Sequence, residues 1–120
     1  MNPIKSKQLV DICPSIFQCP ENHPLALFGI ECDDGWYDLL RDLIKEIKVI
    51  VEKDNLDVKV VQIKEKFGTL RFYMDGLTDD IIKAIAQAEA KSAVTCEICG
   101  KPGKLRKVNR WLFTSCDLCL

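Results

Sequence analysis

The clearest hydrophobic pattern of the chain lies in residues 58–74, VKVVQIKEKFGTLRFYM, where β-branched and aromatic residues alternate with polar ones on both sides of Phe67-Gly68. Alternation with a period of two around a glycine predicts a β-hairpin. Pairing Lys66 with Thr69, through a two- or four-residue loop, gives one apolar face: Val61, Ile63, Leu70, Phe72 and Met74. The other face then carries Gln62, Lys64, Arg71 and Tyr73. A slip of one residue would mix the two sets, so this register is expected, with helices covering the apolar face.

Two segments that flank the hairpin have a helical pattern. Apolar residues recur at three- and four-residue spacing from about Trp36 to Lys53 and from Thr78 to about Ala93, which predicts two amphipathic helices. Asp33 or Asp34 is the expected N-cap of the first helix, because a carboxylate is favourable at the positive end of a helix. The predicted fold class is therefore α+β, a small antiparallel sheet packed on two helices.

The N-terminal third is less regular. A short helix is expected over residues 2–12, with Asn2 as its cap and Pro3 at its first position. Residues 13–30 contain three prolines and are expected to be irregular, with scattered apolar anchors.

Four cysteines near the C-terminus have the spacing of a metal site. Cys96 and Cys99 form one C-x₂-C pair, and Cys116 and Cys119 form a second one sixteen residues later. This spacing suits tetrahedral zinc, and four thiolates leave no position open for a water molecule. So short a segment cannot bury a sufficient core by itself, so the metal must supply its folding energy. The sequence predicts one structural Zn²⁺ per chain, in a zinc ribbon over residues 95–120 that follows an α+β domain over residues 1–94.

A second metal site is considered at the remaining cysteines and the single histidine: Cys13, Cys19, His23 and Cys32. These residue types suit zinc, but their spacing is irregular and no glycine follows to form a tight turn. Reduced thiols without metal are the expectation.

Length and composition describe the setting. The chain has 120 residues, 48% of them hydrophobic, which is enough for a globular core. No run approaches the ~18 apolar residues of a membrane span, so no membrane partner is expected. The N-terminus lacks the apolar stretch of a signal peptide, which predicts a cytoplasmic protein with reduced thiols.

The net charge of −1 hides a basic C-terminal segment. Residues 96–120 hold five basic and two acidic side chains, but four thiolates with one Zn²⁺ reduce this excess to about +1. Within this segment Lys104-Leu105-Arg106-Lys107 and Arg110-Trp111-Leu112-Phe113 interleave basic residues with apolar ones, which include the rings of Trp111 and Phe113, and this pattern can bind nucleic acid. Packing of both rings onto the helix over residues 78–93 is the favoured interpretation, because so small a module has few other core residues.

Lys64 and Arg71 lie opposite each other in the predicted register, an arrangement that costs ~0.2–1 kcal/mol. Two interpretations stay open. In the first and favoured one, solvent screens the charges and a carboxylate from Glu31, Asp33 or Asp34 joins them. In the second, the two cations bind a phosphate.

The second interpretation defines a candidate ligand site. Tyr73 would offer a ring for stacking, and the helix N-terminus next to Asp34 would favour an anion. The residues of this site are Gln62, Lys64, Lys66, Arg71, Tyr73, Asp34 and Trp36.

Three stretches together resemble a family of uncharacterised small phage and prophage proteins. They are FGIECDDGW at residues 28–36, QIKEKFGTLRFY at residues 62–73, and the terminal CxxCG with its later CxxC. The resemblance covers most of residues 28–120, although Asp33 replaces the usual glycine of the family. It implies a phage genome and the host cytoplasm as the setting. Small phage proteins of this kind often inhibit host defence, either by acting on a protein or by sequestering a nucleotide signal.

The leading hypothesis is a non-enzymatic binding protein for a phosphate-bearing ligand, either a nucleotide or a nucleic acid. The first alternative is a protein–protein inhibitor of a host defence factor, with an exposed apolar patch around residues 13–28. The second is a metal-dependent phosphoryl hydrolase that uses Glu31, Asp33 and Asp34. A homo-oligomer is compatible with each of them.

Overall fold

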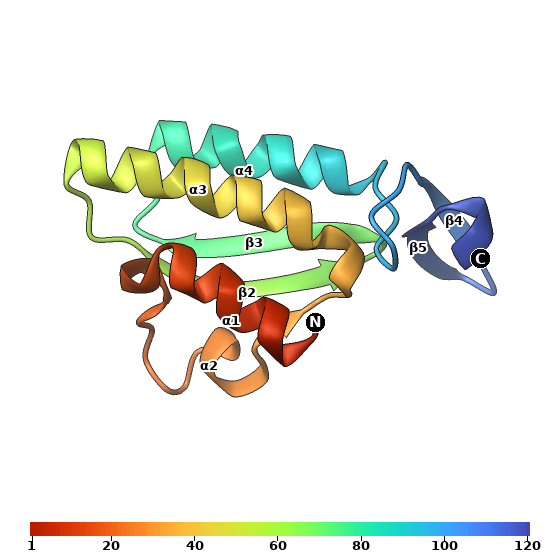
Figure 1. The fold of residues 1–120 in the computed structure, drawn as a ribbon, viewed down its shortest axis with the longest axis horizontal. Coiled ribbons are helices and arrows are strands. Elements are labelled where there is room, and N and C mark those ends of the chain that lie inside the picture. The colour runs from red at the N-terminus through yellow and green to blue at the C-terminus, as the bar shows by residue number, and fades with distance from the viewer.

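The computed structural model describes all of residues 1–120, and Figure 1 shows its fold. The helices and strands are α1 (Pro3–Ile12), α2 (Pro24–Phe28), β1 (Ile30–Glu31), α3 (Tyr37–Asp54), β2 (Lys59–Lys66), β3 (Thr69–Asp75), α4 (Asp79–Ser92), β4 (Lys104–Val108) and β5 (Trp111–Ser115). Three 3-10 helices join them: η1 (Pro14–Phe17), η2 (Asp34–Trp36) and η3 (Asp117–Cys119). The predicted α+β class, with a hairpin sheet on helices, is confirmed.

The hairpin has the predicted register over most of its length. Lys66 pairs with Thr69, and the pairing continues in step to Gln62 opposite Tyr73. A β-bulge then intervenes, so Met74 pairs with Val60 and not with Val61. The prediction that Val61 belongs to the apolar face is therefore wrong: Val60 is fully buried, and Val61 is the extra residue of the bulge.

A third strand extends the sheet. β1 pairs with β2 in parallel, with Ile30 beside Ile63 and Glu31 beside Lys64, so the strand order is β1-β2-β3. Paired residues point to the same face of a sheet. Ile30 and Ile63 accordingly join the buried side, whereas Glu31 joins the polar side.

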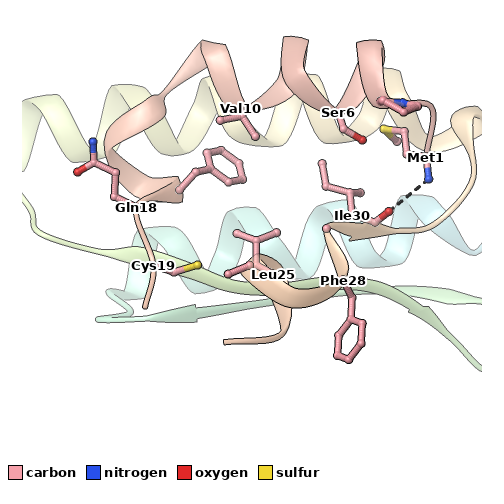
Figure 2. A pocket seen from close by; sticks show the side chains of 12 residues that line it. Met1, Ser6, Val10, Gln18, Cys19, Leu25, Phe28 and Ile30 are labelled. Atoms are coloured by element: carbon pink, nitrogen blue, oxygen red, sulfur yellow. Dashed lines mark hydrogen bonds between the residues drawn. The ribbon is translucent and has the colours of Figure 1, made fainter. Parts of the chain in front are cut away.

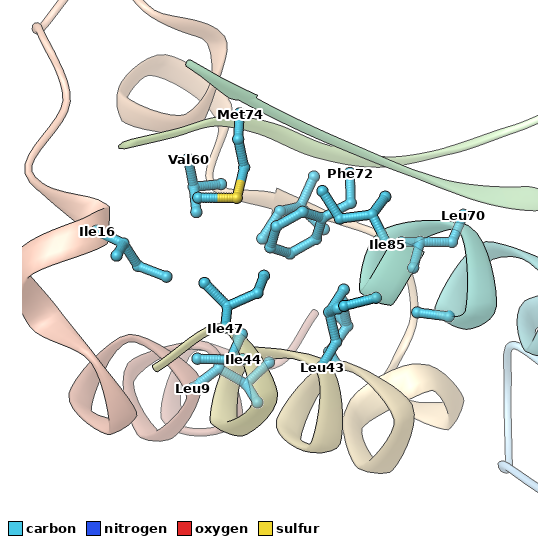
Figure 3. Close-up of a cluster of buried hydrophobic side chains, with 14 of the residues drawn as sticks. Leu9, Ile16, Leu43, Ile44, Ile47, Val60, Leu70, Phe72, Met74 and Ile85 are labelled. Atoms are coloured by element: carbon cyan, nitrogen blue, oxygen red, sulfur yellow. The ribbon is translucent and has the colours of Figure 1, made fainter. Parts of the chain in front are cut away.

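The core lies between this sheet and the helices, as Figure 3 shows. Residues from α1 and α3, such as Leu9, Ile44 and Ile47, face Val60 and Phe72 of the hairpin. α4 lies beside α3 along the sheet (Figure 1), and its Ala84 and Ala88 are buried where the two helices meet. Small side chains allow this close approach. None of the helices is both long enough and apolar enough to cross a membrane.

The ends of the helices test the capping predictions. Asn2 caps α1, since its side-chain oxygen accepts from the backbone N of Ile4 at 2.8 Å, and Thr78 caps α4 in the same way. The prediction that Asp33 or Asp34 caps the helix over residues 36–53 is wrong. A turn of 3-10 helix, η2, precedes α3, and no side chain caps α3.

The outer edge of β3 is covered by side chains of α4. The backbone N of Leu70 donates to Ser92 Oγ at 2.9 Å, and the backbone N of Phe72 donates to Glu89 Oε2 at 3.1 Å. Two amides that an edge strand would otherwise leave unpaired therefore have partners within the chain.

Candidate metal centre and ligand face

The four predicted metal ligands come together at the C-terminal end of the molecule. The sulfur atoms of Cys96, Cys99, Cys116 and Cys119 all lie within 4.8 Å of one another, and Cys99 Sγ is 3.6 Å from Cys116 Sγ. Four sulfurs bound to one zinc ion at ~2.3 Å would be separated by ~3.8 Å in tetrahedral geometry. The cluster is a possible metal site whose geometry fits four-coordinate binding.

Backbone amides prepare two of these thiols for ionisation. Burial would raise the pKa of Cys96, but hydrogen bonds from the amides of Cys116, Cys99 and Ile98 outweigh burial and lower that pKa to about 6. The pKa of Cys116 is lowered in the same way, against its burial, by neighbouring thiols and by the amides of the second turn. A thiolate is the form of cysteine that binds metal, so these contacts favour the ligand state of Cys96 and Cys116, whereas hydrogen bonds with Cys116 and Cys99 raise the pKa of Cys119 to about 12.

The first cysteine pair is held by the segment that precedes α3. The backbone N of Gly35 donates to Glu97 O at 2.7 Å, and Trp36 Nε1 donates to Thr95 O at 2.9 Å. A Cβ atom on Gly35 would lie 2.3 Å from Cys96 O, so only glycine fits against this turn. Gly35 and Trp36 thus form a docking surface for residues 95–97.

The turn of the β2–β3 hairpin holds the other part of the ribbon. Thr114 Oγ1, which is buried, donates to Gly68 O at 2.6 Å. A Cβ atom on Gly68 would lie 2.4 Å from Leu105 Cδ1 and 3.1 Å from the backbone N of Phe113. Both glycine motifs that the sequence singles out therefore contact the ribbon. The signal in each was a glycine next to an aromatic residue, but nothing local showed its partner.

The Thr114–Gly68 contact supports a prediction. Thr114→Val keeps the shape of the side chain but removes the buried donor, and leaves Gly68 O without its partner. We expect a loss of about 1–3 kcal/mol in the free energy of unfolding, measured by urea denaturation. Thr69→Val is the control, since Thr69 Oγ1 makes an exposed bond to Lys66 O, and it is expected to change stability by less than about 1 kcal/mol. Equal effects of the two substitutions would contradict the role given to Thr114.

The hairpin places the two predicted cations as expected. Lys64 pairs directly with Arg71, and no ion pair of the structure includes either of them. Glu31 lies beside Lys64 on β1, but its carboxylate accepts from Gln62 Nε2 at 3.1 Å. The structure therefore shows no carboxylate paired with Lys64 or Arg71, contrary to the first interpretation.

Two other members of the predicted ligand site do not belong to this face. Trp36 is fully buried and bonded to Thr95, so the prediction that it borders the site is wrong. The carboxylate of Asp34 accepts from the backbone N of Asn2 at 2.8 Å, which ties it to the start of α1. Both predictions fail for the same reason: the segment that contains Asp34 and Trp36 makes long-range tertiary contacts and does not cap α3.

Other proposed clusters do not assemble. The oxygens of Glu31, Asp33 and Asp34 do not gather into a group that could hold a metal ion, and neither do the side chains of Cys13, Cys19, His23 and Cys32. The backbone N of Asp33 instead donates to Glu97 Oε2 at 3.0 Å. The carboxylates needed for the hydrolase alternative are therefore not arranged around a common centre.

Trp111 is placed differently from expectation. Its side chain is 70% exposed, so the prediction that it packs the ribbon onto the helix over residues 78–93 is wrong. Phe113 is half-buried, and its backbone lies against Gly68. The ribbon docks through the Gly68 turn, which leaves Trp111 at its tip.

The comparisons with known proteins come to one result. No protein-family model, no curated protein and no solved structure matches the chain. The resemblance to small phage proteins therefore stays an expectation.

A separate hollow of about 530 Å³ lies between α1 and α2 (Figure 2). Apolar side chains make up most of its lining, and Val10, Leu25 and Cys19 point into it. The N-terminal ammonium of Met1 donates to Ile30 O at 3.3 Å at one end. Leu27 and Phe28 on α2 are exposed. This surface contains part of the apolar patch expected around residues 13–28.

Proposed function

We propose that this chain is a non-enzymatic binding protein for a phosphate-bearing ligand, which binds on the polar face of the β2–β3 hairpin. The observation that carries the proposal is the pair Lys64 and Arg71, placed directly opposite each other and joined to no carboxylate. Like charges in this position destabilise a sheet by ~0.2–1 kcal/mol. A bound phosphate would offset that cost and add charge-assisted hydrogen bonds.

The neighbouring side chains suit such a ligand. Tyr73 is 42% exposed and lies beside Gln62 in the register, so its ring is free to stack on a base. Gln62 is fixed by Glu31, and Lys66 adds a third cation further along β2. Arginine is well suited to bidentate contact with phosphate, whereas lysine acts as a point charge.

The metal has a structural part in this proposal. Four thiolates are the donor set typical of structural zinc, and they leave no coordination position for a substrate. We therefore assign the cluster to one Zn²⁺ that holds residues 95–120 folded against the Gly35 and Gly68 turns. In a phage setting, the ligand would be a nucleotide signal or a nucleic acid of the host cell, and binding it would counter host defence.

Substitution of the two cations tests the ligand face. We expect Lys64→Ala and Arg71→Ala each to weaken binding of phosphate-bearing ligands about tenfold, because each removes a charge-assisted hydrogen bond. Isothermal titration of the purified chain with linear and cyclic nucleotides and with short oligonucleotides measures the effect. Lys45→Ala, an exposed cation on α3, is the matched control and is expected to leave affinity unchanged.

Affinity should also fall as salt rises, since cations and phosphates interact through screened charges. If neither hairpin substitution changes the affinity, or if Lys45→Ala lowers it equally, the polar face of the hairpin is not the binding site.

A second candidate function is favoured by the hollow between α1 and α2. A host protein could bind the exposed Leu27 and Phe28 and insert an apolar side chain into the space beside them. An inhibitor of this kind needs no affinity for phosphate. The same titration separates the two candidates, because a protein inhibitor would show no binding of any nucleotide or oligonucleotide.

A further inference from the structure

A second recess lies away from the hollow described above, between two hairpin turns. Figure 1 shows that the turn of the β2–β3 hairpin lies at the end of the sheet nearest the β4–β5 ribbon. A hollow of about 380 Å³ is present there. Its lining comes from both hairpins: Glu65, Lys66, Phe67, Arg110, Trp111 and Leu112. We call these six residues the turn cleft.

The turn cleft exposes two large aromatic side chains. Phe67 is 63% exposed and Trp111 is 70% exposed. Both lie at hairpin turns, where polar residues are common. A tryptophan and a phenylalanine that line one recess form an exposed apolar patch, and patches of this kind mark binding surfaces.

The backbone of both turns is unusual for these side chains. Phe67 has φ +55° and Arg110 has φ +68°, each in a two-residue turn whose residues all have positive φ. Glycine and asparagine are preferred in such turns, because bulky side chains are strained in the left-handed region. Strained conformations of this kind cluster at functional sites. Two bulky residues held in this conformation on either side of one recess indicate that their side chains are needed there.

The charges of the turn cleft favour an anion. Lys66 and Arg110 contribute two cations, and no ion pair of the structure includes either of them. Lys66 Nζ lies 5.5 Å from the centre of the Phe67 ring. The one carboxylate of the cleft, Glu65, accepts from the backbone N of Gly68 at 2.6 Å and so is directed at the turn.

The turn cleft also continues the polar face of the hairpin. Lys66 follows Lys64 by two residues on β2, so their side chains project from the same face of the strand. The cations therefore run from Arg71 and Lys64 through Lys66 to Arg110. Cations that follow one another along a strand and into a recess suit a ligand with several phosphates in a row, such as a chain of nucleotides.

We propose that the turn cleft binds single-stranded nucleic acid, with bases stacked on Phe67 and Trp111 and phosphates contacted by Lys66 and Arg110. This inference rests on the proposed function and narrows the ligand from any phosphate-bearing molecule to a polynucleotide. A duplex is excluded as the preferred ligand, because its bases are already stacked on one another and cannot also stack on exposed side chains.

Fluorescence anisotropy of the full chain with labelled oligonucleotides tests the proposal. The probes are oligo-dT and oligo-rU of about twelve nucleotides, within the site size of single-strand binding proteins, and a duplex of the same length. We expect Trp111→Ala and Phe67→Ala each to weaken binding of the single strands about tenfold. Val49→Ala, which truncates a similarly exposed apolar side chain on α3, is expected to change nothing.

Tryptophan fluorescence gives an independent readout. The chain has two tryptophans, and Trp36 is fully buried, so quenching by a stacked base reports on Trp111. Trp111→Phe is expected to keep most of the affinity and to lose the quenching. The relative affinities for oligo-dT and oligo-rU then show whether the ligand is DNA or RNA.

The outcomes separate this inference from the proposed function. If Lys64→Ala weakens single-strand binding but Trp111→Ala and Phe67→Ala do not, the turn cleft is not the binding site. The polar face of the β2–β3 hairpin would then still be supported as the site of the proposed function. Equal affinity for a mononucleotide and an oligonucleotide, or preference for the duplex, would also overturn the turn-cleft proposal. Absence of binding to every oligonucleotide and nucleotide would overturn both.

Discussion

Replacing Cys99 with serine is expected to release the metal and to lower the free energy of unfolding by at least about 4 kcal/mol. Native mass spectrometry should find one zinc ion per chain in the parent protein and none in the variant. Urea denaturation followed by circular dichroism measures the loss of stability. Cys19→Ser is the matched control, because Cys19 lies outside the cluster, and it should keep one zinc ion.

The size of this effect follows from what the ribbon buries. Within residues 95–120 the buried side chains are Cys96, Thr114, Ser115 and Cys116, so no leucine, isoleucine or aromatic residue forms a core there. Binding of zinc contributes ~10–16 kcal/mol to the folding of isolated zinc-finger peptides. The α+β part has its own core and should keep its helices in the variant. A Cys99→Ser protein that still holds zinc and melts like the parent would contradict the assignment.

Gly35→Ala is expected to cost about 3 kcal/mol and to weaken retention of zinc. The new Cβ atom would lie 2.3 Å from Cys96 O and 2.4 Å from Glu97 O, and both are backbone atoms of the first cysteine turn. Either η2 or this turn must shift, and a shift of the turn disturbs the ligand geometry. Urea denaturation gives the loss of stability, and competition with a chelator gives the change in zinc affinity.

Gly29→Ala is the control for Gly35→Ala. Gly29 has φ +67° and ψ −151°, a conformation almost restricted to glycine, so alanine there is strained by about 1–3 kcal/mol, but its Cβ atom would meet nothing within 4 Å. The control should lose some stability and keep the zinc affinity of the parent. Similar losses in both variants, with unchanged zinc affinity, would show that the contact between Gly35 and the cysteine turn does not support the metal site.

The hairpin was predictable because its register is set by alternation. From Lys66 to Gln62 each step places an apolar or a polar residue on a definite face, and the structure has that pairing. The pattern fails at Val60-Val61, where both residues are β-branched and apolar. Either could face the core, so the sequence could not show that a bulge turns Val60 inward.

The candidate sites were predictable only where the signal was local. The cysteine spacing identified the metal ligands, because ligand spacing is a property of two short turns. Asp34 and Trp36 were misplaced, because Asp34 contacts Asn2 and Trp36 contacts Thr95, which lie 32 and 59 positions away, and contacts between such distant residues leave no periodic pattern in the sequence. The turn cleft could not be predicted from the sequence for the same reason, since Phe67 and Arg110 belong to turns that only the tertiary fold brings together.

The α4 side chains that cover β3 also limit how the protein can associate. Ser92 and Glu89 occupy the amides of Leu70 and Phe72, so an incoming strand from another molecule would find no free donors along this part of the sheet. Recognition by strand addition, and fibrous self-assembly from the same edge, would first require α4 to move away. Crowded solutions of the protein should therefore contain no aggregates that are paired through the β3 edge as long as α4 remains docked.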